Sequence, residues 1–275
     1  MLLNEISPSP SLAEYVRLYR VIDFRFPSPD VPFKAYPPRP EHCLQFMARE
    51  PEKIIYPDSG REMARMQAIF MGPHTRLIHR YPGQHTLGFQ VIFQPGAVYR
   101  LTRFSCDELA NQYIDASLVF GPEVHQVTEQ LSAAKNYREL IAIAEHFLLE
   151  RCRRVNPRTH PVDEVSKAMI KEMDRFSLDG FLQAACLSHR QVDRKFRERI
   201  GIAPKQFLQM ARFDKAFRMK NRYPNKDWLT VALHCGYYDY QHLVKAYKEF
   251  TGYTPVQFFT IDNNAPERML GDAET

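Results

Sequence analysis

The sequence predicts an α+β protein with a β-rich N-terminal domain and an all-α C-terminal domain. Between about residues 42 and 95, short runs of β-branched and aromatic residues alternate with turn pairs such as Gly72-Pro73 and Pro82-Gly83. This pattern is typical of an antiparallel sheet. From Val162 onward, apolar residues recur at helical spacing instead. A chain of 275 residues is long enough to bury one or two such cores.

The composition is ordinary for a soluble globular protein, with 44% hydrophobic and 25% charged residues. The five cysteines form no Cys-x-x-Cys pair, which favours a reducing compartment over a zinc ribbon or a disulfide framework. The first residues lack the basic and apolar regions of a signal peptide, and we find no apolar run long enough to span a membrane. We therefore expect a cytoplasmic protein with no membrane partner.

The net charge of +5 is unevenly distributed. Residues 153–260 hold 20 Lys and Arg against 11 Asp and Glu, whereas the rest of the chain holds 17 against 21. A basic domain joined to a slightly acidic one fits a module that binds a polyanion. The charge distribution alone is equally consistent with helix faces that are simply exposed to water.

In the N-terminal domain, residues 5–20 place Leu12, Tyr15, Val16 and Tyr19 at helical spacing, which predicts a short helix or an extended arm. Six prolines within 27–40 exclude a helix and a central strand. The strands predicted next are Cys43–Ala48, Lys53–Tyr56, Gln67–Met71, Arg76–Tyr81 and Leu87–Phe93. We expect them to form a sheet with a cupin-like or small-barrel arrangement.

After Pro95-Gly96 the pattern becomes helical. Ser105 with Glu108 has the spacing of a capping box. Residues 122–134 and 136–151 predict two amphipathic helices that either cover the sheet or form a dimerisation surface. The first domain is thus expected at 1–152, as a β-rich effector-binding and dimerisation domain with helices at 122–151.

A segment with four arginines and two prolines, 151–161, interrupts the helical pattern, so we expect a linker at 153–161. The second domain is expected at 162–260, followed by a frayed polar tail at 261–275. Its predicted helices are 162–175, 178–186, 189–200, 204–220, 227–235, 240–250 and 255–259.

Two stretches of this domain repeat one pattern 51 residues apart. Ser188 and Asp239 are placed to cap a helix, and Gly201 and Gly252 are placed to end it. The apolar stripe of the first helix is Val192, Phe196 and Ile200, which predicts a face packed on a core. Pro204 and Pro255 then open the next helix. We interpret this as two similar helical units.

Each unit has a short helix, a tight turn and a second helix with a polar outer face, which is the helix-turn-helix arrangement. The second helix of such a unit enters the major groove of DNA, where Arg, Gln and Asp side chains can recognise bases. The candidate base-reading residues are Arg190, Asp193 and Arg194 in the first unit and Tyr240, Gln241, His242 and Lys245 in the second. The candidate phosphate contacts are Lys205, Arg212 and Lys215.

The segment from Phe176 to Phe259 resembles the DNA-binding domain of the AraC/XylS family of transcription regulators. The motifs that carry the resemblance are Leu187-Ser188-His189-Arg190-Gln191-Val192-Asp193-Arg194-Lys195-Phe196, Gly201-Ile202-Ala203-Pro204-Lys205-Gln206-Phe207, Val231-Ala232-Leu233-His234-Cys235-Gly236-Tyr237 and Phe250-Thr251-Gly252-Tyr253-Thr254-Pro255. The resemblance implies a double helix-turn-helix fold in which one linking helix holds two recognition helices, 189–200 and 240–250, in successive major grooves. It covers about a third of the chain.

The sequence departs from the family pattern at three places. Ala185-Cys186 lacks the usual glycine of the first turn, and Ala203 replaces the expected hydroxyl cap that Thr254 keeps in the second unit. Asp193 is acidic on a face that should meet DNA. The N-terminal region resembles, more loosely, the β-rich sensory domains of one poorly characterised subgroup, for which no effector-binding residues can be named.

The resemblance implies a bacterial regulator that binds promoter DNA and is not an enzyme. A small-molecule effector, RNA polymerase and a second copy of the chain are the further partners that it implies, with activation the expected mode. His74, His79 and His85 suggest one alternative, a cupin-type metal enzyme with an accessory helical domain, but they lack the usual ligand spacing, so we predict no metal and no cofactor. The other alternative is a constitutive DNA-binding protein with a degenerate sensor domain.

Overall fold

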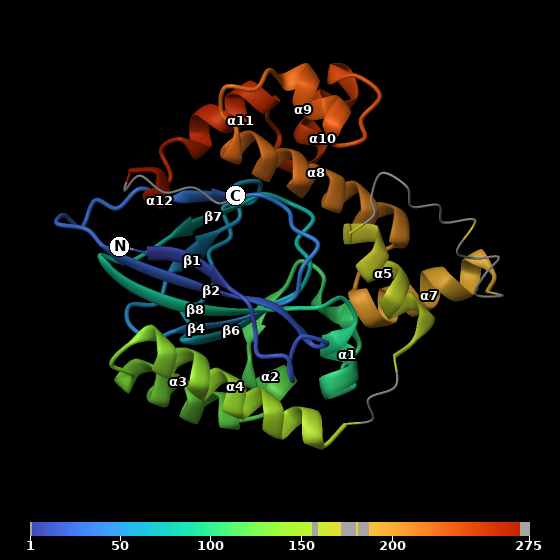
Figure 1. The fold of residues 1–275 in the computed structure, drawn as a ribbon. Helices are drawn as coiled ribbons and strands as arrows, with labels where there is room; N and C mark the ends of the chain where they lie inside the picture. Colours follow the sequence, from blue (N-terminus) through green and yellow to red (C-terminus); the bar gives the residue numbers. More distant parts are fainter. Residues whose placement is uncertain (1, 156–158, 172–179, 181–186, 270–275) are drawn as a thin grey trace.

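The computed structural model describes residues 2–155, 159–171, 180 and 187–269. Within them, the N-terminal half forms two antiparallel sheets, as the sequence predicts (Figure 1). The larger sheet has the order β1-β2-β8-β4-β6-β9 and the smaller one has the order β3-β7-β5. The strands are β1 (Leu2–Ile6), β2 (Val16–Arg25), β3 (Lys34–Tyr36), β4 (Cys43–Met47), β5 (Lys53–Ile55), β6 (Ala68–Met71), β7 (Ile78–Tyr81), β8 (His85–Phe93) and β9 (Tyr113–Asp115).

The long strand β8 organises the larger sheet, because it pairs with β2 on one side and with β4 on the other. Its residues alternate between the two faces of the sheet. Phe89 and Val91 join an apolar core with Phe46 of β4 and Phe70 of β6, whereas Gln90 faces a polar interior on the other side. The strand is therefore buried on both faces.

Helices cover the apolar face of the larger sheet, which confirms the first of the two roles predicted for 122–134 and 136–151 (Figure 1). Val124 and Leu131 of α3 and Leu140 and Leu148 of α4 are buried in that core. Asn136 caps α4 by accepting a hydrogen bond from the Glu139 backbone N–H. The helical elements of this half are α1 (Ala97–Thr102), the 3-10 turn η1 (Cys106–Leu109), α2 (Ser117–Phe120), α3 (Glu123–Ala133) and α4 (Tyr137–Arg153).

The described C-terminal half is helical and packs around one core, which Ala35 and Leu77 of the β-rich half also join. Figure 1 shows these helices beside and above the sheets, with α8 running across. The helices are α5 (Pro161–Lys171), α7 (His189–Ile200), α8 (Pro204–Arg222), α9 (Trp228–His234), α10 (Tyr240–Thr251), α11 (Pro255–Asp262) and α12 (Pro266–Met269). The helix predicted at 178–186 lies outside the described residues. The division of the chain at 153–161 stays a prediction.

Three local predictions are wrong. Residues 5–20 form neither a helix nor an arm, because Leu12 lies in a turn and Val16 begins the long strand β2. The Ser105 side chain makes no capping hydrogen bond, and only a short 3-10 turn follows it. The tail is not frayed over 261–269, since Asp262, Ala265 and Glu267 are buried there.

The two halves contact each other at several places, including ion pairs of Asp214 and Arg218 of α8 with Arg39 and Glu5. Gly201, at the end of α7, approaches the Cys106 backbone carbonyl of η1, and Glu198 of α7 accepts a 2.6 Å hydrogen bond from the Tyr99 hydroxyl of α1. On another side, Lys34 of β3 forms a buried ion pair with Asp262 of α11. The helical half is thus joined to the β-rich half through α7, α8 and α11.

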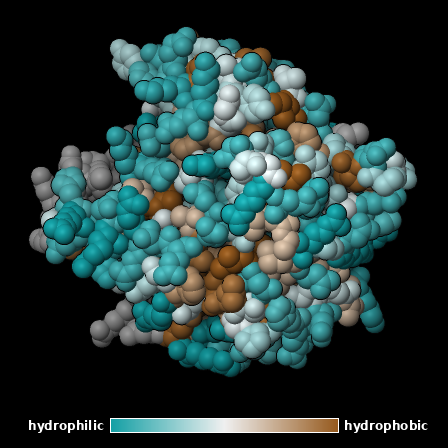
Figure 2. Space-filling view, turned by 180° about the vertical axis from the view of Figure 1, so that it is seen from behind, coloured by the Kyte–Doolittle hydropathy of each residue, from teal (hydrophilic) through white to brown (hydrophobic). Residues whose placement is uncertain are grey.

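From behind, the surface is mainly hydrophilic, with hydrophobic side chains in small separate groups (Figure 2). Among the described residues, no helix combines the length and the apolar character that crossing a membrane requires.

The three histidines that suggested a metal site lie in different surroundings. His74 is buried beside Tyr113, His79 packs against Phe33, and His85 is exposed.

Two histidines are held uncharged inside the β-rich half. Burial lowers the pKa of His42 to about 4, and its ring lies against Phe70. Burial likewise lowers the pKa of His74 to about 4, against the weaker opposing effect of its hydrogen bond to the Gly72 carbonyl. Glu41 is different, because burial raises its pKa but Arg20, Arg17 and the other arginines around it together outweigh this effect and lower the pKa to about 2.

We expect the free energy of unfolding to fall between pH 7 and pH 5. The unfolded histidines take up a proton near pH 6.5 and the folded ones only near pH 4, so protonation in this window favours the unfolded chain. The loss is about 2 kcal/mol per histidine at pH 5, whereas Glu41 changes little until the pH falls further. Urea unfolding of the wild type and of His42→Phe at pH 7 and pH 5 measures this loss. The variant should lose only about half as much free energy of unfolding as the wild type between the two pH values.

The control is His125→Gln, because the His125 side chain is 56% exposed. This variant should behave like wild type at both pH values. Equal stability of the wild type at pH 7 and pH 5 would contradict the uncharged burial of the two rings.

Candidate nucleic-acid interface

The first predicted recognition helix, α7, has the amphipathic form that its sequence indicates. Val192, Phe196 and Ile200 are buried in the C-terminal core. Ser188 caps the helix through a complete capping box with Gln191, and Gly201 ends it in the left-handed region at φ 94°. The N-terminal half of the helix therefore presents its opposite face to solvent.

Three predicted base-reading residues lie on that solvent face. Arg190 and Arg194 are exposed. Asp193 is 48% exposed and accepts a 3.0 Å hydrogen bond from Arg197 one turn later. This pairing offsets the negative charge that the sequence places on the face.

The second predicted recognition helix, α10, begins at the Asp239 cap and ends at Gly252, which has φ 80°. Leu243, Tyr247 and Phe250 are buried. The preceding turn contains Gly236 at φ 75°, a conformation that glycine adopts without strain. The equivalent turn of the first unit, at Ala185-Cys186, lies outside the described residues.

The predicted base-reading residues of α10 differ in their exposure to solvent and in their contacts. Gln241 and Lys245 are exposed. The His242 ring lies 3.0 Å from the Asp239 carboxylate, and Tyr240 is half-buried against the core. Tyr238, which the sequence analysis did not select, is 85% exposed beside His242. Its position in the turn before a predicted recognition helix could have indicated it as a candidate DNA contact.

The linking helix α8 joins the two units through aromatic contacts. Phe207, near its start, packs edge-on to Phe196 of α7 at 5.4 Å between ring centroids. Phe213, further along, packs on Tyr247 of α10 at 4.8 Å. Nineteen residues make a helix about 28 Å long. The two recognition helices are therefore attached to one rigid element at separate positions.

The predicted phosphate contacts are not gathered at one place. Arg212 lies in a groove between α8 and α10 together with His242 and Lys245, and its guanidinium lies 5.8 Å from the Tyr237 ring centroid. Lys205 is exposed in the first turn of α8. Lys215 lines other hollows of the surface, one of them beside Arg17 of the β-rich half.

Comparison with known proteins agrees with this geometry. Residues 181–260 match the family model described as a helix-turn-helix domain. The chain carries an AraC-type helix-turn-helix domain. Residues 4–115 match a second model, which is described only as a domain of unknown function.

Two curated relatives are transcription regulators by name. The HTH-type transcriptional regulator ArgR of Pseudomonas aeruginosa is 26% identical over 129 residues, which cover 42% of this chain and 38% of that protein. The HTH-type transcriptional regulator MtrA of Neisseria gonorrhoeae is 29% identical over 94 residues, which cover 34% and 31%. The chain thus matches less than two fifths of the length of either relative.

The overall fold is similar to that of an apo ToxT variant from Vibrio cholerae. The TM-score is 0.51 at 9% sequence identity, over 90% of this chain and 97% of ToxT. At this identity the likeness concerns the fold alone. It covers both halves, which confirms the predicted combination of a β-rich domain and a helical domain with a helix-turn-helix.

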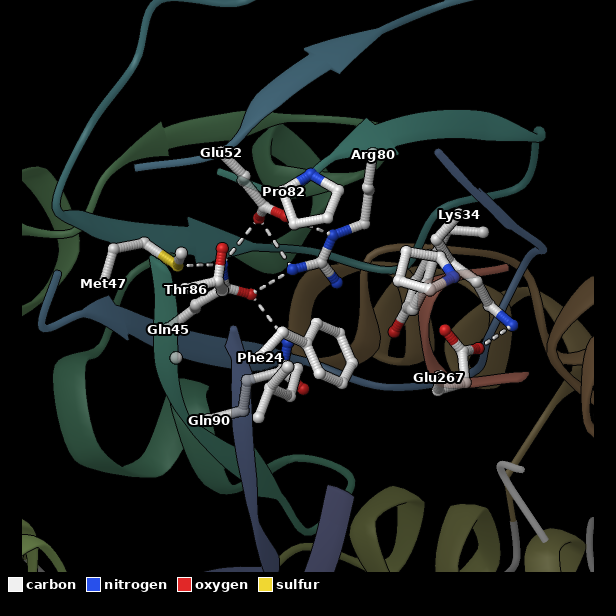
Figure 3. Close-up of a pocket in the computed structure, with 14 residues that line it drawn as sticks. Phe24, Lys34, Gln45, Met47, Glu52, Arg80, Pro82, Thr86, Gln90 and Glu267 are labelled. Atoms are coloured by element: carbon white, nitrogen blue, oxygen red, sulfur yellow. Dashed lines mark hydrogen bonds and ion pairs between the residues drawn. The ribbon is translucent and has the colours of Figure 1, made fainter. Parts of the chain in front are cut away.

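One site was missed by the sequence analysis. A cavity opens inside the β-rich half, lined in part by Lys34, Gln45, Glu52, Arg80 and Gln90 (Figure 3). Polar residues within otherwise apolar strands, such as Gln45 in β4 and Gln90 in β8, were the signal that could have indicated it.

The two units offer a direct test of helix capping. Ala203 and Thr254 precede Pro204 and Pro255 with nearly the same backbone, at φ −71° in both, yet only Thr254 forms a capping box, with Gln257. We expect Ala203→Thr to form the equivalent box with Gln206 and to raise the free energy of unfolding by about 1 kcal/mol. Urea unfolding measures the change.

The matched control is Thr254→Ala, which should lower the free energy of unfolding by a similar amount. If Ala203→Thr leaves the protein unchanged or destabilises it, the two caps are not equivalent.

Proposed function

We propose that the chain is a sequence-specific transcription regulator that inserts α7 and α10 into successive major grooves of promoter DNA. The observation that carries this proposal is the orientation of the two helices. Each buries its apolar stripe in one shared core, and each leaves polar side chains of its N-terminal turns exposed. The names of the two curated relatives support the same function.

Arg190 and Arg194 are the proposed readers in the first groove, because an exposed arginine can donate two hydrogen bonds to guanine. Asp193 orients Arg197 and can accept a hydrogen bond from cytosine. Gln241, His242 and Lys245 are the proposed readers in the second groove, with Tyr240 in a smaller role because it is half-buried.

Lys205, Arg212 and Lys215 are proposed to bind phosphates, which would position the domain without selecting a sequence. The basic excess of residues 153–260 supports this role. Arg212 shares a groove with Lys245, so we assign Arg212 to a phosphate next to the bases that α10 reads.

The β-rich domain is proposed to bind a small-molecule effector, and its cavity supports this role. Effector binding controls transcription only if the ligand favours one of two conformations. RNA polymerase and a second copy of the chain are further proposed partners, with activation as the mode and the cytoplasm as the location. The protein acts in this proposal through binding rather than catalysis.

Arg194→Ala tests the assignment of the first recognition helix. Loss of a bidentate contact with a base is expected to cost about 1–3 kcal/mol at the cognate site and to relax the preference at one base pair. Selection of bound sequences from a random pool, followed by titration of the best site, measures both quantities. An unchanged sequence preference would show that Arg194 reads no base.

Two variants serve as controls for Arg194→Ala. Lys205→Ala should weaken binding to all sequences alike and reduce the salt slope by about 1, because it removes a phosphate contact. Arg76→Ala removes an arginine that is 71% exposed in the β-rich domain, and it should change neither quantity.

A further inference from the structure

The His242 ring is tied to the residue that caps its own helix. Asp239 precedes α10, and its Oδ1 accepts a 2.8 Å hydrogen bond from the His242 backbone N–H. The same oxygen lies 3.0 Å from Nδ1 of the His242 ring. In α7 the equivalent residue, Gln191, instead turns back to the backbone N–H of its cap. The two recognition helices therefore differ in what the third side chain of the helix can offer to a ligand.

The contact with Asp239 decides which nitrogen of the His242 ring carries the proton. The hydrogen bond from the His242 backbone N–H lowers the pKa of Asp239, so this group is an ionised carboxylate at neutral pH. An ionised carboxylate only accepts hydrogen bonds, so Nδ1 is the nitrogen that donates. A neutral imidazole has a single N–H, so its Nε2 keeps a lone pair. The hydrogen-bond network thus assigns Nε2 of His242 as an acceptor.

This acceptor is directed toward solvent. The two nitrogens of an imidazole point away from each other, so a ring whose Nδ1 faces the cap turns its Nε2 away from the cap. The His242 side chain is 59% exposed. The Tyr238 ring packs edge-on against it, at 5.9 Å between ring centroids. The ring is thus held by two neighbours and presents a lone pair on the face of α10 that is proposed to meet DNA.

An acceptor in the major groove can bind only an amino group. The base edges there offer adenine N6 and cytosine N4 as donors, whereas guanine O6 and N7 and thymine O4 are acceptors. Phosphate oxygens are acceptors as well, so a neutral His242 with this proton arrangement is not a phosphate contact. In the major groove each base pair carries its amino group on one strand only. A contact of this kind therefore selects which strand carries the adenine or the cytosine.

The side chain one turn later has the opposite chemistry. Lys245 follows His242 by three positions on the same helix face and lines the same groove. A lysine has donors and no acceptor, and it binds the O6 and N7 of guanine. Helix α10 therefore places an acceptor and a donor side by side, which allows it to distinguish the two kinds of base edge.

We propose that His242 reads the amino group of one adenine or cytosine through Nε2, and that Asp239 is the positioning residue that keeps the ring proton on Nδ1. This inference rests on the proposed DNA-binding function and specifies what the second recognition helix recognises. Guanine and thymine are rejected at this position, because their acceptor atoms face the lone pair of the ring.

Selection of bound sequences from a random pool by the full-length chain tests the assignment. We expect the wild type to favour adenine or cytosine over guanine or thymine about fivefold at one position, which is what one hydrogen bond contributes. His242→Ala identifies the position, because its preference is lost there and kept elsewhere. His242→Lys should reverse the preference at that position to guanine or thymine, since an ammonium group only donates.

Variants of Asp239 separate positioning of the ring from capping of the helix. Serine caps a helix about as well as aspartate does, as Ser188 does in α7, but its short side chain does not hold the ring. Asp239→Ser should therefore admit guanine and thymine at the identified position and leave the rest of the selected site unchanged. Asp239→Asn is the matched control and should keep the preference, because it retains the one oxygen that accepts both hydrogen bonds.

Three results would overturn the proposal. They are a wild-type preference for guanine or thymine at the identified position, a selected site that His242→Ala leaves unchanged, and an undiminished preference in Asp239→Ser. Failure of the wild type to select any sequence would contradict the DNA-binding function itself, which Arg194→Ala tests separately on α7.

Discussion

The packing of α8 against both helical units is the constraint on which the DNA-binding arrangement depends. Phe207 contacts α7, and Phe213 and Phe217 contact Tyr247 of α10 and Phe258 of α11. These rings are buried in one core, so neither recognition helix can turn without disturbing the other. The spacing of the two polar faces is therefore built into the core.

The β-rich domain follows a different principle, since one of its two interiors is polar. A network of hydrogen bonds connects Arg20, Gln90, Gln45, Arg80 and Glu52 across four strands. Such a network is expensive to bury and is stable only when its members are satisfied. The cavity lies where this network meets the apolar residues of the sheet and the segment that follows α11. The ion pairs of Lys34 with Asp262 and Glu267 also join the two halves of the chain.

The sequence predicted those elements whose stability is local. The strands at 43–93 and the helices from 189 to 262 agree with the structure to within a few residues, because turn pairs, caps and apolar spacing identify them. Leu12 and Tyr15 misled the helical interpretation of 5–20, since their burial reflects packing on distant residues rather than one helix face. Ser105 had the right spacing for a cap, but no helix of sufficient length followed.

The exposed faces of α7 and α10 were predictable, because they follow from the apolar stripes on the opposite faces. The cavity was not. Lys34 and Asp262 are separated by 228 positions, and Gln45 and Gln90 by 45. The sequence pattern around each residue does not indicate which distant residue it contacts in the fold. The frayed tail was expected for the same reason, since its polar residues find their partners only in the folded protein.

The most direct test of the central claim is a hydroxyl-radical footprint of the full-length chain on its selected DNA site. Two recognition helices fixed on α8 predict two protected patches on one face of the duplex, with centres about 10 base pairs apart. A single protected patch, or two patches on opposite faces of the duplex, would contradict the account.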